Sequence, residues 1–138
     1  MNTYNITYNI KQIDTIAKQI LHHINTNIIV FNGEIGAGKT TLIKALLKAM
    51  GSKDNITSPT FSLVNTYEIP NNLVYHFDLY RITSITEVLD IGFEDYLHTN
   101  AWVFIEWPDH VLNFLPKHYN CISITLDKTS KERTLSIS

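Results

Sequence analysis

The sequence predicts an α/β fold of three layers, in which a mixed sheet has parallel strands at its centre and antiparallel strands added to it. Short apolar runs rich in β-branched residues, typical of buried parallel strands, stand beside segments whose apolar residues recur at helical spacing. Near both ends of the chain, apolar and polar residues alternate, which is typical of strands with one exposed face. At 138 residues and 44% hydrophobic, the chain can bury one core, so we expect a single domain over residues 1–138.

The first third of the chain predicts two strands and two helices. Residues 4–10 alternate and predict an opening strand, and Asp14 is positioned to cap a helix whose apolar stripe covers residues 16–24. Residues 27–32 form a short, β-branched apolar run, as expected of a buried central strand. Residues 42–50 then repeat apolar side chains at helical spacing, so the order is strand, connection, helix.

The rest of the chain predicts further strands around this centre. Residues 52–60 are polar and contain Pro59, so we expect an exposed connection there. Strands follow at 61–69 and 74–80, with a turn at 70–72 between them. The remaining predicted elements are a helix capped by Ser84 and Glu87 that ends near Gly92, a buried strand over 101–107, a short helix over 109–115, and a closing antiparallel pair of 122–126 and 135–137.

Residues 33–41 match the phosphate-binding pattern G-x-x-x-x-G-K-[ST] between the predicted strand and helix. Glycines let backbone N–H groups turn toward phosphates, Lys39 offers a positive charge to the outer phosphates, and the Thr40 hydroxyl is suited to Mg²⁺. A chance match to the pattern would not be expected to lie between a buried strand and a helix. We therefore predict a P-loop NTPase-like domain that binds a nucleoside triphosphate. The expected binding residues are Gly33, Gly36, Ala37, Gly38, Lys39, Thr40 and Thr41.

Two carboxylates could complete this site. Asp78 and Glu106 each end an apolar, strand-like run, and in a parallel sheet both would lie beside the phosphate loop. We expect one acid to bind Mg²⁺ and the other to orient water, but the pattern does not say which. The alternative for each acid is a solvated strand end or an ion pair with Arg81.

Missing motifs narrow the functional class. The sequence has no N-K-x-D run to read guanine, no L-S-G-G-Q run, and no lid with several arginines, since Arg81 and Arg133 are its only two. A small-molecule kinase usually places arginines around the migrating phosphoryl group, so hydrolysis or regulated nucleotide binding is favoured over phosphorylation. A formal net charge of -2 with dispersed Lys and Arg predicts that any role with nucleic acid is indirect.

Other residues have weaker signals. Ser58, Pro59 and Thr60 follow the phosphate-loop helix and could sense the γ-phosphate, although an ordinary turn fits equally well. His76 is interpreted as structural or surface, and Trp107 as core packing. Cys121 is interpreted as a buried thiol, and with no apolar signal or membrane-spanning run we expect a soluble, cytoplasmic protein that does not contact a membrane.

Four separated stretches resemble the bacterial TsaE family of small P-loop ATPases, which act in the biosynthesis of threonylcarbamoyladenosine (t6A) in tRNA. The second and third stretches are more specific than the phosphate loop, because nucleotide binding in general does not require them. The four stretches are residues 33–42, 58–67 (SPTFSLVNTY), 76–81 (HFDLYR) and 104–108 (FIEWP).

The resemblance implies roles for these residues. It implies that Gly33 to Thr41 bind ATP, that Thr40 and Glu106 hold Mg²⁺, and that Asp78 positions the attacking water, so that Lys39, Asp78 and Glu106 are the catalytic set. It further implies a nucleotide-sensitive switch at Ser58, Pro59 and Thr60. Arg133, and less surely Lys11 and Gln12, would approach the adenosine.

The resemblance also implies partners. Family members are ATPase accessories that bind the TsaB and TsaD subunits, so contact with tRNA would be made mainly by those partners. We therefore expect a slow, Mg²⁺-dependent ATPase that serves t6A modification. The alternative is a nucleotide-gated binding module, in which ATP occupancy and not hydrolysis controls partner assembly.

Overall fold

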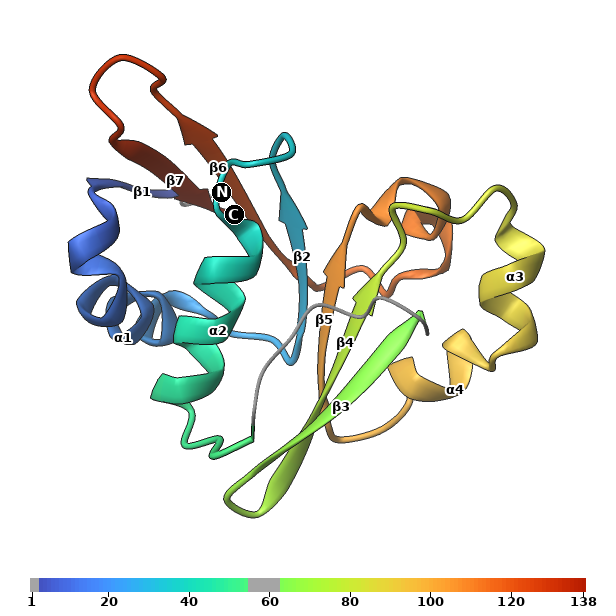
Figure 1. Cartoon of the computed structure of the whole chain (residues 1–138). Helices are drawn as coiled ribbons and strands as arrows, with labels where there is room; N and C mark the ends of the chain where they lie inside the picture. Colours follow the sequence, from blue (N-terminus) through green and yellow to red (C-terminus); the bar gives the residue numbers. More distant parts are fainter. Residues whose placement is uncertain (1–2, 55–62) are drawn as a thin grey trace.

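A computed structural model describes residues 3–54 and 63–138, and within them seven strands form one sheet (Figure 1). The strand order is β1-β7-β6-β2-β5-β4-β3. The strands are β1 (Tyr4–Tyr8), β2 (Ile28–Asn32), β3 (Val64–Ile69), β4 (Asn72–Asp78), β5 (Trp102–Glu106), β6 (Asn120–Leu126) and β7 (Arg133–Ile137). The helices are α1 (Ile13–His23), α2 (Lys39–Ala49), α3 (Ile85–Asp90) and α4 (Phe93–Leu97), with 3-10 turns η1 (Ile10–Gln12), η2 (Pro108–His110) and η3 (Leu112–Phe114).

The sheet is parallel at its centre and antiparallel toward its edges. Strand β2 pairs in parallel with β5 and with β6, and β5 pairs in parallel with β4. Antiparallel pairs add β3 to β4 on one side, and β7 and then β1 to β6 on the other. The predicted fold class, a mixed sheet with a parallel centre, is confirmed.

Helices cover both faces of the sheet, because the central strands are apolar on both sides (Figure 1). Ile29 and Phe31 of β2 pack in one cluster with apolar residues of α1 and α2. Ile28 and Val30 of the same strand pack in a second cluster with residues of α3, α4 and the segment after β5. The alternation along β2 therefore supplies both halves of a three-layer core.

Several predicted element boundaries are wrong. Asp14 does not cap the first helix, because η1 precedes α1 and Asn9 caps η1: its side chain accepts from the Lys11 N–H, and Gln12 accepts from the Asn9 N–H. Strand β1 consequently ends at Tyr8 and not at residue 10. The predicted short helix over 109–115 is two 3-10 turns, η2 and η3.

The hairpin and the helix after it also differ in detail. Ile69 pairs with Asn72, so the β3–β4 turn is only Pro70 and Asn71, and β4 ends at Asp78. Residues 61 and 62 of the predicted strand lie outside the described residues. The capping box of Ser84 and Glu87 is present, and α3 ends at Asp90, close to Gly92 as predicted. A second helix that the sequence did not predict, α4, follows Gly92, which lies in the left-handed region.

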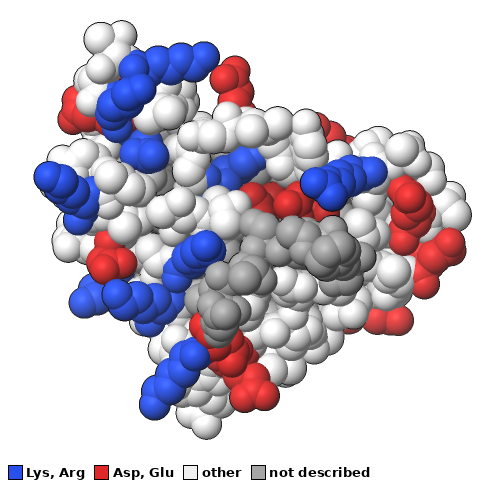
Figure 2. Space-filling model, viewed as in Figure 1, with Lys and Arg blue, Asp and Glu red and all other residues white. Residues whose placement is uncertain are grey.

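Charged side chains are dispersed over the face shown in Figure 2, where Lys and Arg do not gather into one patch. Among the described residues, no helix combines the length and the apolar character needed to cross a membrane.

Candidate functional site

The phosphate loop connects the end of β2 to the start of α2. Gly36 and Gly38 have φ of 84° and 106°, in the left-handed region that favours glycine. At Gly38 a side chain would also collide with its surroundings, because an added Cβ would lie 2.8 Å from Nε of Arg133. Gly38 therefore meets two requirements at once, a positive φ and the close approach of an arginine.

Lys39, the first residue of α2, folds back across its own loop. Its Nζ donates to the Gly33 carbonyl at 2.6 Å and lies 3.3 Å from the centroid of the Trp107 ring. The residue is 6% exposed, and burial lowers the pKa of its ammonium, against the opposing charges of Glu106, Asp78 and Asp109. The lysine is thus held inside the site by a carbonyl and an indole face.

The two strand-end acids lie side by side. Asp78 of β4 and Glu106 of β5 are paired Cα positions in the parallel ladder. Both line a pocket of about 300 Å³ together with phosphate-loop residues and the first turn of α2. The residues that line this pocket are Ile35, Gly36, Gly38, Lys39, Thr40, Thr41, Asp78, Glu106, Trp107 and Arg133.

The environments of these two acids differ. Burial raises the pKa of Asp78, and the nearby Glu106 carboxylate raises it further. The Tyr80 N–H, which donates to Asp78 at 3.1 Å, His76 and Lys39 act in the opposite direction. Glu106 is only 2% exposed, and its Oε2 lies 2.7 Å from Nε2 of His76. Asp78 is therefore the acid with access to solvent, and Glu106 is the buried one.

Two residues interpreted as structural belong to this site. His76 is buried on β4, so the surface alternative is wrong, and it contacts Glu106. Trp107 packs partly against the core, but its ring also covers Lys39 and lies 4.9 Å from the ring of Tyr80. Period-two alternation was a signal for His76, which shares a strand face with Asp78. The sequence carried no signal for the contact of Trp107 with Lys39. This contact depends on the left-handed backbone of Trp107 itself, whose φ is 56°.

Arg133 approaches the loop from β7, which lies on the opposite side of β2 from the strands that carry Asp78 and Glu106. It begins β7, where it pairs with Tyr8 of β1, and it lines the same pocket. Its Nε and the Tyr8 hydroxyl are buried without a hydrogen-bond partner among the described residues. Burial raises the pKa of Tyr8, while the Arg133 charge lowers it. Lys11 and Gln12 lie in η1 and do not line this pocket.

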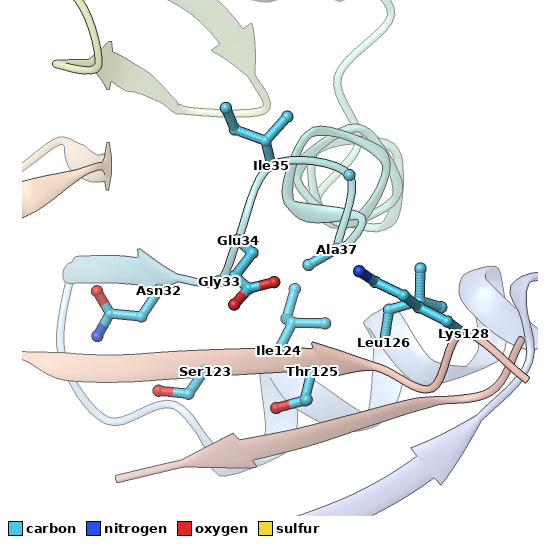
Figure 3. Close-up of a pocket in the computed structure, with 11 residues that line it drawn as sticks. Asn32, Gly33, Glu34, Ile35, Ala37, Ser123, Ile124, Thr125, Leu126 and Lys128 are labelled. Atoms are coloured by element: carbon cyan, nitrogen blue, oxygen red, sulfur yellow. The ribbon is translucent and has the colours of Figure 1, made fainter.

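A second pocket of about 310 Å³ lies between the phosphate loop and β6 (Figure 3). Glu34 and Ala37 contribute from the loop, and Ile124 and Leu126 contribute from the strand. The ammonium of Lys128 points back toward the loop in this view. Of the predicted nucleotide-binding residues, Gly33 and Ala37 line this pocket and not the first one, and Gly36 lines both.

The geometry therefore places most of the predicted phosphate-loop residues, both acids and Arg133 around one cavity, whereas Gly33 and Ala37 line the neighbouring one. The predicted switch at Ser58, Pro59 and Thr60 lies outside the described residues. A sequence model of the threonylcarbamoyl adenosine biosynthesis protein TsaE matches residues 7–135. The chain belongs to the TsaE family.

Curated TsaE proteins of three bacteria illustrate the similarity. The Haemophilus influenzae protein is 39% identical over 97 residues, covering 70% of this chain and 61% of its own length. The Rickettsia typhi protein is 38% identical over 107 residues (76% and 74%), and that of Borreliella burgdorferi is 40% identical over 91 residues (65% and 66%). Each is named a tRNA threonylcarbamoyladenosine biosynthesis protein, and the alignment spans less than two thirds of the first.

A solved structure shows the same fold. The crystal structure of Bacillus subtilis YdiB superposes with a TM-score of 0.72 and covers 99% of this chain and 86% of its own, at 23% identity. Membership of the TsaE family, together with this P-loop-like fold, indicates a nucleotide-binding protein.

Proposed function

We propose that this TsaE family member binds ATP with Mg²⁺ and hydrolyses it as an accessory of t6A modification, acting with TsaB and TsaD. The observation that carries the proposal is the meeting of Asp78 and Glu106 in one pocket with Lys39 and Thr40. A phosphate loop alone accounts for binding, whereas paired acids at the adjacent strand ends supply groups for a metal and for water.

The loop supplies the phosphate contacts. Free backbone N–H groups at the start of α2 would donate to a bound anion, and the 11-residue helix would add its positive end. When a nucleotide binds, the Lys39 ammonium would exchange the Gly33 carbonyl for phosphate oxygens. The new contact joins two full charges, whereas the carbonyl offers only a dipole. Arg133 brings a second cation to the Gly38 side of the same pocket.

The donors in the pocket suit Mg²⁺. A hydroxyl from Thr40 and carboxylates from Asp78 and Glu106 are all hard oxygen ligands. Mg²⁺ at nucleotide sites usually takes its remaining ligands from phosphates and water. When bound, Mg²⁺ neutralises charge on the phosphates. We assign Thr40 and Glu106 to the metal.

Asp78 is the residue proposed to act on water. Its raised pKa makes it a better proton acceptor than an ordinary aspartate, and its carboxylate is only partly buried. Glu106 is enclosed and already hydrogen-bonded to His76, which suits a ligand held in one orientation.

The alternative function is a nucleotide-gated binding module, and one observation favours it. Lys39 touches Trp107, whose ring in turn lies tilted against that of Tyr80, a residue that is 53% exposed. If Lys39 moved toward a bound phosphate, the Trp107 ring would lose its contact with the ammonium and could shift against Tyr80. ATP binding alone, without hydrolysis, would then alter the exposed surface at Tyr80.

The test is t6A formation on tRNA reconstituted with TsaB and TsaD. Lys39→Ala should abolish modification under either function, because ATP binding is lost. Asp78→Asn should retain ATP binding but abolish modification if hydrolysis is required, and should support modification if occupancy is sufficient. Full modification with Lys39→Ala would overturn both.

A further inference from the structure

His76 is a buried titratable residue with a single polar contact in the described part of the chain. Its Nε2 lies 2.7 Å from Oε2 of Glu106, and the two side chains are 1% and 3% exposed. Its Nδ1 has no hydrogen-bond partner among the described residues. The polar function of the ring is therefore directed at one oxygen of Glu106.

The backbone of this histidine is held from both sides. His76 pairs with Phe104 of β5 in the parallel ladder and with Asn65 of β3 in the antiparallel one. Tyr67 lies beside its ring, at 6.3 Å between centroids. A histidine in this position has little freedom to follow a moving carboxylate, so the carboxylate has to conform to the histidine.

Within the described part of the chain, the Glu106 side chain has no hydrogen bond other than the one to His76. A buried carboxylate without a hydrogen bond pays a large desolvation cost and can rotate toward any nearby cation, here Lys39. A hydrogen bond to Oε2 lowers that cost and selects one rotation of the carboxyl group. Oε1 is then the oxygen left for a further ligand.

We propose that His76 is a positioning residue, which holds Oε2 of Glu106 so that Oε1 is presented to Mg²⁺. This inference rests on the assignment of Glu106 to the metal under the proposed function. Removal of a residue that is hydrogen-bonded to a metal ligand typically lowers metal affinity by about 10- to 100-fold. His76 acts through Glu106 and contacts neither nucleotide nor metal.

Nucleotide binding measured against Mg²⁺ concentration tests the proposal. A fluorescent ADP analogue is titrated onto each variant in EDTA and at rising Mg²⁺. His76→Gln carries an amide nitrogen at the position of Nε2, whereas the side chain of His76→Asn is one carbon too short to reach Glu106. His76→Asn should need about 10- to 100-fold more Mg²⁺ for the same gain in affinity. His76→Gln should recover most of this loss, and binding in EDTA should be the same for both.

A purely structural role for His76 predicts a different result. In that case both variants would weaken binding in EDTA as much as in Mg²⁺, or both would keep the Mg²⁺ response of the unaltered protein, and either result overturns the proposal. Thermal unfolding of both variants checks that each one folds. Both replacements are polar, so the comparison does not depend on an apolar side chain beside the buried Glu106.

Glu106→Gln separates this proposal from the function on which it rests. If Glu106 holds the metal, Glu106→Gln loses most of the Mg²⁺ response, and adding His76→Asn to it causes no further loss. If Glu106→Gln keeps a normal response, the metal assignment itself is wrong. If Glu106→Gln loses the response while His76→Asn keeps it, only the positioning role is overturned.

Discussion

The ammonium of Lys39 lies 3.3 Å from the centroid of the Trp107 ring and donates to the Gly33 carbonyl at 2.6 Å. The phosphate-loop lysine is therefore engaged by groups of its own protein. A cation over an indole contributes about 0.5–2 kcal/mol, so phosphates can displace this contact.

Bound nucleotide should consequently change the fluorescence of Trp107. In Trp102→Phe, where Trp107 is the sole tryptophan, ADP with Mg²⁺ should alter the emission because Lys39 leaves the indole. In Trp107→Phe, where Trp102 remains, the same titration should give little change. An equal response from both variants would show that Lys39 stays on the ring or that the signal comes from elsewhere.

Gly38 should tolerate a side chain less well than Gly36. Both residues have positive φ, so alanine at either position costs about 1–2 kcal/mol of backbone strain. An added Cβ at Gly38 also lies 2.8 Å from Nε of Arg133, whereas at Gly36 it meets nothing within 4 Å. Urea unfolding should therefore show a larger loss for Gly38→Ala, and adding Arg133→Ala should reduce the excess. Equal losses would contradict the close approach of Arg133.

Asp78→Asn should stabilise the fold at neutral pH. The pKa of Asp78 is raised above its usual value of 3.8, so the native state binds this proton more tightly than the unfolded chain. The carboxylate therefore costs stability above its raised pKa, and the cost disappears as the pH falls below the unfolded value. The variant should unfold at a higher temperature than the parent at pH 7, with the difference shrinking in acid.

Asp127 provides a control of opposite sign for that pH series. The N–H groups of Ser130 and Thr129 donate to it and lower its pKa. Its carboxylate therefore adds stability above its usual pKa, and this stability is lost as the pH falls through the lowered value. Asp127→Asn should thus be less stable than the parent at pH 7. Destabilisation by Asp78→Asn at pH 7 would contradict the assigned environment of Asp78.

Asn120→Ala should damage the fold while sparing the site. Asn120 is 5% exposed, and its Oδ1 accepts from the N–H groups of Asn25 and Thr26 and from the Thr26 hydroxyl. The two backbone N–H donors would lose their acceptor, at a cost of about 1–3 kcal/mol each when buried, whereas the Thr26 hydroxyl can still donate to the Ile28 carbonyl. Asn120→Asp keeps the acceptor and should be milder. Nucleotide affinity under native conditions should not change, because Asn120 begins β6, at the end of the sheet away from the phosphate loop.

The sequence predicted the central fold because local patterns carry it. The double-sided apolar run at Ile28–Asn32, the spacing of α2 and the alternation of β6 and β7 require no knowledge of distant contacts. Boundaries such as that before α1 failed because Asn9 offered a competing cap five residues before Asp14.

Site contacts were less predictable, because they depend on register and on unusual backbone. The position of Asp78 and Glu106 at one edge of the sheet follows from parallel pairing, but the contact of His76 with Glu106 needs the register of β4 against β5. The approach of Arg133 to Gly38 depends on the return of β7 beside β6, more than 90 residues later.

The most direct test of a Mg²⁺–ATP site in this pocket is calorimetric titration of ATP with Mg²⁺ onto the chain and onto Lys39→Ala. The account predicts one binding site per chain, with affinity lowered at least about 100-fold in the variant, since a charged partner of the phosphates is removed. Unchanged binding by Lys39→Ala would contradict it.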